Sequence, residues 1–303
     1  MLAFRAVPEP PYATLAEADD PRPGSSEALV AVRATSLNRG EVSRMRLREP
    51  GTVVGWDVAG VVERAAADGS GPPEGARVVG LLQAGAWAQR AAVPTRDLAE
   101  LPDGVSFEQA ATLPVAAVTA LYGLDIAGSL IGERVCITGA SGGVGRFAIQ
   151  LARLGGARVT AIARRSEGLR ELGADEVTSE LAADGEPFRA VLDAIGGPVL
   201  ASAIRRLEPF GTVVSFAATV PEETSLAPRD LYGRNGTVRG LMVFSHADRQ
   251  GGAGRALARL AALVAAGRLE PQIDLVSSWR DAPAAFQALL DRRVAGKAVL
   301  TID

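Results

Sequence analysis

The sequence predicts an α/β protein in which a small β-barrel-like domain is combined with a doubly wound parallel sheet. Two observations lead to this fold class. Over the first hundred residues, short apolar runs alternate with turns rich in glycine and proline, which is typical of closely spaced strands in a small barrel. From residue 134 onward, short β-branched runs alternate with apolar residues at helical spacing, and this alternation predicts a parallel sheet covered by helices.

The composition narrows the class of protein. The chain has 303 residues, 48% hydrophobic content and a net charge of −3, so it can bury a sizeable core and carries no basic excess for a nucleic acid. Cys136 is the only cysteine, which leaves no intrachain disulfide and no cysteine metal cluster. The first residues lack a signal-peptide pattern and no apolar run is long enough to span a membrane, so we expect a soluble cytoplasmic protein.

Four extended runs in the first hundred residues are expected to form the strands of the first domain. Clusters of glycine, proline and serine between them mark turns. Glycines inside the second run indicate bulges or corners of a barrel. The expected strands cover residues 28–34, 53–63, 77–81 and 86–93.

The second part of the chain is organised around residues 134–165. A β-branched run at 134–138 predicts a buried strand, a glycine-rich turn and a helix follow, and a second strand is expected at 158–165. The helix has one apolar face, and the pair Gly155 and Gly156 ends it. The whole unit is a strand, a turn, a helix and a strand in about thirty residues, as in mononucleotide-binding halves of doubly wound sheets.

The turn within this unit carries a dinucleotide fingerprint with alanine in the place of the first glycine. Its spacing is Ala140-x-Gly142-x-x-Gly145. The N–H groups and the positive dipole at the N-terminus of the following helix favour a pyrophosphate, so Ser141, Gly142, Gly143 and Val144 are the expected phosphate-binding residues. The alternative is a tight connection in some other doubly wound fold.

The end of the second strand indicates which dinucleotide binds. Sites for NAD usually carry an acidic residue there, about 20 residues past the glycines, to accept hydrogen bonds from the ribose. Here the sequence has Arg164, Arg165 and Ser166, which suit a 2′-phosphate, so NADP(H) is favoured over NAD(H). The alternative is an exposed basic pair in an arginine-rich protein.

The remaining elements continue the alternation of strands and helices. An alanine-rich helix is expected at 107–123, with Pro114 as a break or kink. Further strands are expected at 190–195, 211–217, 238–244, 272–276 and 298–302, and further helices at 199–207, 253–266 and 282–290.

Several stretches together resemble one family in order and spacing. The chain is similar to the zinc-free branch of the medium-chain dehydrogenase/reductase superfamily, which contains quinone oxidoreductases and enoyl reductases. The resemblance implies a GroES-like β-barrel domain over residues 1–108, a Rossmann domain over 109–267, and a return of residues 268–303 to the first domain. Besides the fingerprint, the matching stretches are 36–38, 55–62, 75–80, 102–111, 113–114, 119–120, 171–175 and 296–300.

The zinc ligands of the superfamily are replaced in this sequence. Zinc-binding members use a thiolate, a histidine and a further thiolate or carboxylate at the places held here by Asn38, Trp56 and Val115. Indole and isopropyl groups cannot ligate a metal that needs about three donors, so we expect no zinc. Without this Lewis acid, simple alcohol oxidation is disfavoured, and hydride delivery from NADPH to a quinone or an α,β-unsaturated carbonyl is favoured.

The resemblance also implies catalytic residues. Asn38 matches a hydrogen-bond donor to substrate or cofactor, Thr119 matches a hydroxyl that faces the nicotinamide ribose or the substrate, and Asp57 matches an acid at the floor of the site. Each has a structural alternative. Asn38 can instead cap a turn, Thr119 can form a hydrogen bond inside its helix, and Asp57 can be an ion-paired structural carboxylate.

Residues beyond the fingerprint complete the expected cofactor site. Gly196, Ala217, Ala218 and Phe244 fall where loops at the end of the sheet surround the nicotinamide in the family. Lys297, the only lysine, either orders the rim of the site or reaches the cofactor, and a surface strand position is the alternative. His246, the only histidine, is a candidate proton donor or a solvent-facing loop residue.

These observations favour an NADPH-dependent reductase of quinones or activated alkenes. An enoyl reductase of secondary metabolism is the alternative within the same class. A non-redox protein on the same scaffold, either a cyclase or an NADPH-binding protein, is the alternative from another class. The family also implies a homodimer formed by edge strands of two Rossmann sheets, and the apolar run at 237–244 is the expected edge.

Overall fold

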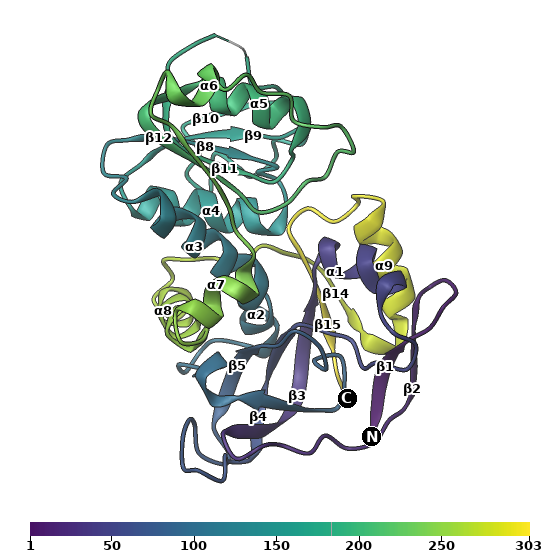
Figure 1. Ribbon diagram of the computed structural model, residues 1–303. Helices are drawn as coiled ribbons and strands as arrows, with labels where there is room; N and C mark the ends of the chain where they lie inside the picture. Colours follow the sequence, from purple (N-terminus) through teal and green to yellow (C-terminus); the bar gives the residue numbers. More distant parts are fainter. Residues whose placement is uncertain (183) are drawn as a thin grey trace. The chain divides into compact units, whose positions relative to one another are not determined.

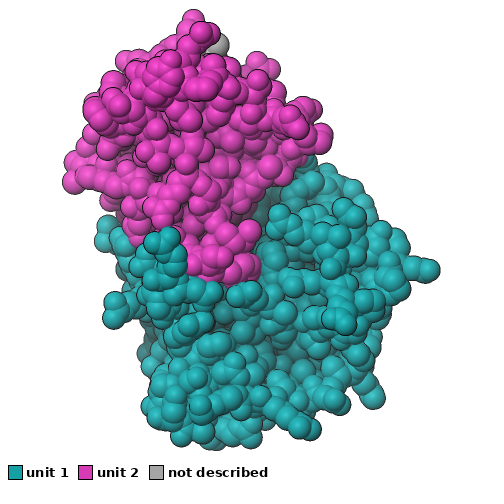
Figure 2. Space-filling model, viewed as in Figure 1, with its two compact units in different colours: residues 1–118, 247–303 teal, residues 119–246 magenta. Residues whose placement is uncertain are grey.

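The computed structural model describes residues 1–182 and 184–303 and divides the chain into two compact units. Unit 1 comprises Met1–Val118 and Ala247–Asp303, and unit 2 comprises Thr119–His246 (Figure 2). These divisions differ from the boundaries near residues 108 and 267 that the sequence predicts. The reason is packing, because helix α8 (Gly254–Ala265) contacts β5 and β7 of the first unit.

Unit 1 is built on a sheet of seven strands in the order β14-β15-β3-β4-β5-β7, with β6 paired to β3 (Figure 1). All pairs are antiparallel except β14 with β15. Since β15 pairs with β3, the C-terminal residues complete the sheet that the first hundred residues begin. The strands are β3 (Glu27–Leu37), β4 (Asp57–Arg64), β5 (Arg77–Leu81), β6 (Arg90–Pro94), β7 (Leu98–Glu100), β14 (Ile273–Ser278) and β15 (Lys297–Thr301).

Shorter elements complete unit 1. A separate pair of antiparallel strands, β1 and β2, lies near the N-terminus. Its strands are β1 (Leu2–Ala6) and β2 (Ala13–Glu17), and the helices are α1 (Arg39–Arg44), η1 (Met45–Leu47), η2 (Thr95–Asp97), α2 (Phe107–Ala111), η3 (Leu113–Ala117), η4 (Trp279–Asp281) and α9 (Ala282–Leu290). Helix α7 (Val243–Arg249) crosses the division between the units.

Aromatic side chains from both ends of the chain form the centre of the unit 1 core. Phe4 meets Trp87 edge-on with ring centroids 6.2 Å apart, and Trp87 stacks on Phe286 at 5.2 Å. Trp279 also contacts Phe4 edge-on. Offset and edge-to-face pairs of this kind add about 0.5–1.5 kcal/mol each beyond the area they bury, so the C-terminal helix is held firmly to the N-terminal strands.

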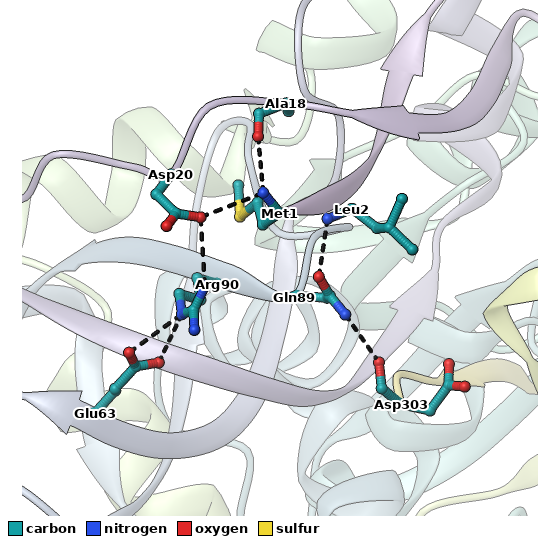
Figure 3. A network of polar contacts seen from close by, with 8 residues as sticks. All are labelled: Met1, Leu2, Ala18, Asp20, Glu63, Gln89, Arg90 and Asp303. Carbon is teal, nitrogen blue, oxygen red and sulfur yellow. Dashed lines mark hydrogen bonds and ion pairs between the residues drawn. The ribbon is translucent and has the colours of Figure 1, made fainter.

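Polar contacts reinforce the same junction at the surface. The side chain of Gln89 accepts a hydrogen bond from the amide of Leu2 at 2.8 Å and donates to the backbone oxygen of Asp303 at 3.3 Å (Figure 3). Arg90 forms ion pairs with Glu63 and Asp20 beside it. Two neighbouring residues just before and within β6 therefore link β1, β4 and the last residue of the chain.

Unit 2 contains a parallel sheet of six strands in the order β10-β9-β8-β11-β12-β13 (Figure 1). In chain order this arrangement is 3-2-1-4-5-6, the order of the Rossmann fold, and the sequence prediction of this fold class is confirmed. The strand order reverses between β8 and β11, where such sheets bind ligands at their carboxyl ends. The strands are β8 (Arg134–Thr138), β9 (Arg158–Ile162), β10 (Glu176–Thr178), β11 (Phe188–Asp193), β12 (Leu207–Ser215) and β13 (Thr237–Gly240), and the helices include α3 (Val118–Ala127), α4 (Gly143–Leu154), α5 (Gly197–Arg205) and α6 (Arg229–Tyr232).

Two segments differ in kind from the sequence prediction. The helix expected at 107–123 is divided into α2, η3 and α3, and η3 is a π-helix that contains Pro114, because proline has no N–H for the regular ladder. The strand expected at 238–244 ends at Gly240, and the following buried residues Val243 and Ala247 have helical spacing in α7.

No helix among the described residues combines the length and the apolarity that crossing a bilayer requires.

Candidate active site and cofactor loops

A cluster of buried polar side chains lies in unit 1 where β3, β4 and β15 meet. Asp57 opens β4 and is fully buried, Asn38 follows β3, and Lys297 opens β15. Glu41 joins them from the first turn of α1. Apolar strands place these four side chains together, because Lys297 and Asp57 each stand at the first position of a strand whose remaining residues are mostly buried.

Asp57 is the centre of this cluster. Its Oδ2 accepts hydrogen bonds from the hydroxyl of Ser36 and from Nδ2 of Asn38, the latter at 2.8 Å. Its Oδ1 accepts from the backbone N–H of Val115 at 3.0 Å, and its backbone oxygen accepts from Thr35. Both carboxylate oxygens of Asp57 are therefore hydrogen-bonded within unit 1.

Lys297 supplies the positive charge. Its Nζ donates to the backbone oxygen of Leu37 at 3.1 Å and to Oδ1 of Asn38 at 2.8 Å, and lies 3.6 Å from Oδ2 of Asp57. Only 3% of its surface is exposed, so it is not the surface strand residue that the sequence left open. Burial lowers the pKa of Lys297, and the nearby carboxylate of Asp57 opposes this effect.

Asn38 bridges the charged groups, and its side chain does not take the capping role that the sequence left open. It stands at the N-cap position of α1, but its side chain makes no capping hydrogen bond. Its Nδ2 donates to Asp57 and, at 3.4 Å, to Glu41, while its Oδ1 accepts from Lys297. An amide has two N–H donors, and both find acceptors inside unit 1.

The π-helix η3 explains how Val115 takes part in this cluster. Pro114 removes one backbone donor, and the wider turn directs the N–H of Val115 to the carboxylate of Asp57 instead of to a helical carbonyl. At the position where the resemblance implies a ligating side chain in metal-binding members, Val115 contributes its backbone N–H. Within the described residues no group of three or more histidine, cysteine or acidic side chains is arranged to hold a metal ion.

The glycine-rich turn of unit 2 has the geometry that a pyrophosphate requires. Gly142 is the N-cap of α4, and Gly143 and Val144 form its first turn, where backbone N–H groups have no intrahelical partner. A Cβ on Gly145 would lie 2.5 Å from Cα of Ala140, so only glycine allows the helix to start this close to the turn. The residues present therefore fit a dinucleotide phosphate group.

The candidate residues for the 2′-phosphate lie in the loop after β9. The sequence predicts that the strand continues to residue 165, but it ends at Ile162, so Arg164, Arg165 and Ser166 belong to the loop. Arg164 and Ser166 are exposed and Arg165 is half-buried. A flexible, exposed guanidinium in such a loop can accommodate a phosphate bidentately.

Arg146 links the two candidate cofactor loops, which are the glycine-rich turn before α4 and the loop after β9. This residue was not identified from the sequence. It lies on the first turns of α4 and is 6% exposed, with Nε donating to the backbone oxygen of Ser141 at 3.2 Å and Nη2 to that of Glu167 at 3.0 Å. A positive charge near a helix N-terminus is repelled by the positive end of the helix dipole. The backbone oxygens of Ser141 and Glu167 offset this repulsion. In the sequence, the one indication of this role is that Arg146 is a charged residue in the otherwise apolar first turns of the helix.

Asp193 organises the loop that follows β11. Its Oδ1 accepts from the hydroxyl of Thr138 at 2.7 Å, and its Oδ2 accepts from the N–H of Gly196 at 3.0 Å. Gly196 has a φ of +79°, a left-handed conformation that favours glycine. Burial raises the pKa of Asp193, while hydrogen bonds from Thr138 and the loop amides favour its charged form. The hydrogen bond between Thr138 and Asp193 thereby joins the carboxyl ends of β8 and β11, the two strands between which the strand order of the sheet reverses.

The remaining candidates of unit 2 lie in loops and helices. Ala217 and Ala218 follow β12 and are exposed, with the Cβ of Ala218 close to Gly196. Phe244 and His246 lie on helix α7, whereas the sequence placed them at a strand end and in a loop. The ring of His246 is 4.7 Å from that of Tyr122, so His246 is packed on an aromatic side chain and is not a solvent-facing loop residue.

Two candidate residues are buried in the strands and helices of unit 2. Thr119 lies at the start of α3 and is 5% exposed. Cys136 lies in the core of β8, where burial raises its pKa to about 12 and keeps the thiol protonated and unreactive. Cys136 is therefore a core residue of β8.

Two protein-family models match the chain. An alcohol dehydrogenase GroES-like domain matches residues 24–103, and a zinc-binding dehydrogenase domain matches residues 172–300. The spectinabilin polyketide synthase system protein NorB of Streptomyces orinoci is 37% identical over 292 residues, which cover 90% of this chain. The chain spans only 5–13% of the length of the polyketide synthases that it matches.

Solved structures resemble the chain over its whole length. An alcohol dehydrogenase superfamily protein from Novosphingobium aromaticivorans is 30% identical with a TM-score of 0.88, and each chain covers 100% of the other. The quinone oxidoreductase from Coxiella burnetii is 26% identical with a TM-score of 0.86, covering 100% of this chain and 99% of that one. Mycobacterial Rv1454c, solved in complex with NADPH, is 25% identical with a TM-score of 0.87 and complete coverage of both chains.

Proposed function

The chain belongs to the medium-chain dehydrogenase/reductase superfamily of oxidoreductases, and from this premise we propose that it is a zinc-independent, NADPH-dependent reductase. Its acceptor would be a compound with a polarised, conjugated double bond. Quinones, α,β-unsaturated ketones and enoyl thioesters share this chemistry. In each of them the hydride adds to an electron-poor atom and negative charge develops on a conjugated oxygen.

One observation carries the proposal. At the three places where relatives hold a catalytic metal, this chain has Asn38, Trp56 and Val115. The Asn38 amide is engaged with Asp57, Glu41 and Lys297, and Val115 offers only a backbone N–H. Indole and isopropyl groups have no lone pair for a metal ion. A substrate that brings its own polarisation therefore suits this chain better than an alcohol, which needs a Lewis acid.

The cofactor loops of unit 2 support the choice of NADPH. When bound, this cofactor supplies a hydride from its nicotinamide ring. The turn at Gly142 and Gly143 would hold the pyrophosphate, and Arg164 with Arg165 would hold the 2′-phosphate. No acidic residue stands at 163–166 to accept hydrogen bonds from a free ribose hydroxyl. Such a residue would also repel a phosphate, so its absence from this stretch favours NADPH over NADH.

The remaining candidate residues take the following proposed roles. The hydroxyl of Thr119 donates to the acceptor oxygen or to the nicotinamide ribose. Gly196, Ala217 and Phe244 line the nicotinamide, and their small or apolar side chains exclude water from the hydride path. Asn38 and Asp57 act through the buried cluster as positioning residues, because their hydrogen-bonding groups are engaged there.

An enoyl thioester is favoured among the possible acceptors by one specific observation. The similarity to the polyketide synthase protein NorB covers 90% of this chain at 37% identity. The similarity to a chloroplastic quinone oxidoreductase homologue covers only 52% of this chain. The chain would then perform the reduction that such assembly systems need after dehydration of a β-hydroxyacyl thioester.

The proposal is tested by the loss of NADPH absorbance at 340 nm with purified protein. A panel of simple quinones, cyclic and linear enones, and enoyl thioesters is offered at equal concentration, with NADH in parallel. We expect turnover with at least one acceptor, the highest kcat/KM for an enoyl thioester, and a preference for NADPH. If calorimetry detects NADPH binding and no acceptor is reduced, the reductase assignment is wrong and a non-redox NADPH-binding protein is favoured.

A further inference from the structure

The carboxyl group of Glu41 is the one member of the buried cluster whose hydrogen bonds are incomplete. Glu41 lies in the first turn of α1 and is 4% exposed. Its Oε2 accepts a long hydrogen bond of 3.4 Å from Nδ2 of Asn38. Its Oε1 is buried and has no hydrogen-bond partner among the described residues. An ionised carboxylate with one long hydrogen bond and no close cation is strongly disfavoured in such a place.

The charges around Glu41 favour the neutral form. Lys297 is committed to Asp57, to Asn38 and to the backbone of Leu37, so one cation already balances one anion. A charged Glu41 would give this cluster an excess negative charge. Arg48, which follows η1, acts on Glu41 only through its field and forms no ion pair with it within the described residues.

Of the other elements that contact this region, α2 packs on β3, β4 and β15 and brings the half-buried Glu108, a further negative charge. Helix α9 packs on α1, and its residues Ala282–Leu290 are all uncharged. The π-helix η3 (Leu113–Ala117) is also uncharged. Burial first, and the negative charge of Asp57 second, raise the pKa of Glu41 well above its usual range. In the neutral form the proton would reside on Oε1, since Oε2 accepts from Asn38.

We propose that Glu41 is a positioning residue that functions as a neutral carboxylic acid: it holds the Asn38 amide, and through it Lys297 and Asp57, in one fixed arrangement. Asn38 could otherwise rotate its amide and present Nδ2 to Lys297, which would place two donors against each other. The neutral acid anchors Nδ2 on the side of the carboxyl groups and keeps Oδ1 facing Lys297. The effect on turnover rests on the proposed function, whereas the effect on folding does not.

Glu41→Gln is the decisive variant, because glutamine has the shape of a neutral glutamic acid and cannot ionise. In the wild type the pKa of Glu41 is higher in the folded than in the unfolded chain, so stability falls as the pH rises from the unfolded towards the folded value. Because glutamine has no proton to lose, the stability of the variant does not fall in this way. Its melting temperature should match that of the wild type near pH 5 and exceed it by roughly 2–4 °C at pH 8.

Glu49→Gln is the matched control. Glu49 lies eight positions later on the same segment and is exposed, and the substitution is chemically identical. The melting temperature of this variant should follow that of the wild type at every pH. If instead Glu41→Gln is less stable than the wild type at pH 8, Glu41 is an anion that the cluster needs, and the inference is overturned. The melting temperatures decide this point whether or not the protein reduces any acceptor.

Kinetics then separate positioning from proton donation. With the best acceptor and NADPH, Glu41→Gln should keep kcat within about twofold of the wild type at pH 7 and should lose any decline of kcat at alkaline pH. Glu41→Ala, which leaves Asn38 without this acceptor, should lower kcat by about tenfold or more, because small misplacements of site groups are costly. Loss of all turnover in Glu41→Gln, with an intact fold, would show that Glu41 gives up a proton in the reaction and would contradict the positioning role.

Discussion

At the scale of single residues, the ion pair between Lys297 and Asp57 is the contact on which the buried cluster depends. Both side chains are almost completely buried. Replacing Lys297 by methionine would leave the carboxylate of Asp57 without a counter-charge. Removing one partner of a buried pair typically costs about 3–5 kcal/mol, so the free energy of unfolding measured in urea should fall by about this amount.

The double variant Lys297→Met/Asp57→Asn is the control for this prediction. It removes both charges, so it should recover a clear part of the lost stability. A double-mutant cycle measures the coupling between the two side chains directly. If the single and double variants lose stability additively, the two residues do not form the coupled pair described here.

The sequence identified most residues of this cluster but not their roles. Asn38, Asp57 and Lys297 were found through the resemblance, yet nothing in their spacing indicates that both N–H groups of Asn38 face carboxyl groups. Glu41 was missed because an acidic residue in the first turn of a helix is ordinarily explained by the helix dipole. Helix α1, which carries Glu41, packs on the distant helix α9, and such long-range contacts have no signature in a local pattern.

At the scale of elements, regular segments were predicted well and irregular ones were not. The strand Arg134–Thr138 and the helix Ala282–Leu290 have the predicted bounds, because apolar periodicity and flanking turn residues agree there. The strand at 158–165 was predicted too long, since Ala163 is buried and continues the apolar run although β9 ends at Ile162. The π-helix at Pro114 could not be anticipated, because proline indicates a break but not its type.

The link that Arg146 forms between the two cofactor loops leads to a prediction at this scale. Arg146→Met keeps most of the apolar stem but removes the hydrogen bonds to Ser141 and Glu167. The loop carrying Arg164 and Arg165 should then be less ordered in the free protein, and NADPH should bind roughly tenfold more weakly in calorimetry, which corresponds to about 1.4 kcal/mol.

Arg153→Met is the matched control for Arg146→Met. Arg153 lies on the same helix, is largely exposed and forms a surface ion pair with Asp175. Such pairs contribute little, so NADPH affinity should be unchanged in this variant. Equal effects of the two substitutions would mean that Arg146 acts only through the stability of the helix.

At the scale of the whole molecule, each main sheet ends in an exposed edge strand. Strand β13 closes the parallel sheet of unit 2, and its four residues Thr237–Gly240 are exposed. Strand β14 closes the sheet of unit 1 and exposes Val276. Unpaired edges with apolar side chains favour association with another strand, and we expect a homodimer through β13.

Two matched substitutions test this assembly. Val238 on β13 and Val276 on β14 are exposed to 40% and 53%. Val238→Arg should convert the dimer to a monomer in light scattering at micromolar concentration, because a charge would be buried in the interface, whereas Val276→Arg should leave the dimer intact. A monomeric wild type, or a dimer lost only in Val276→Arg, would show that β13 is not the interface.

The central claim is that the reaction needs NADPH and no zinc, because Trp56 and Val115 stand where a metal would need ligands. The most direct measurement is NADPH oxidation by protein dialysed against a strong chelator, with the metal content of the same sample determined by elemental analysis. We predict full turnover of the best acceptor with far less than one zinc per chain, and no gain when zinc is added back. Activity that disappears on chelation and returns in proportion to added zinc would contradict the account.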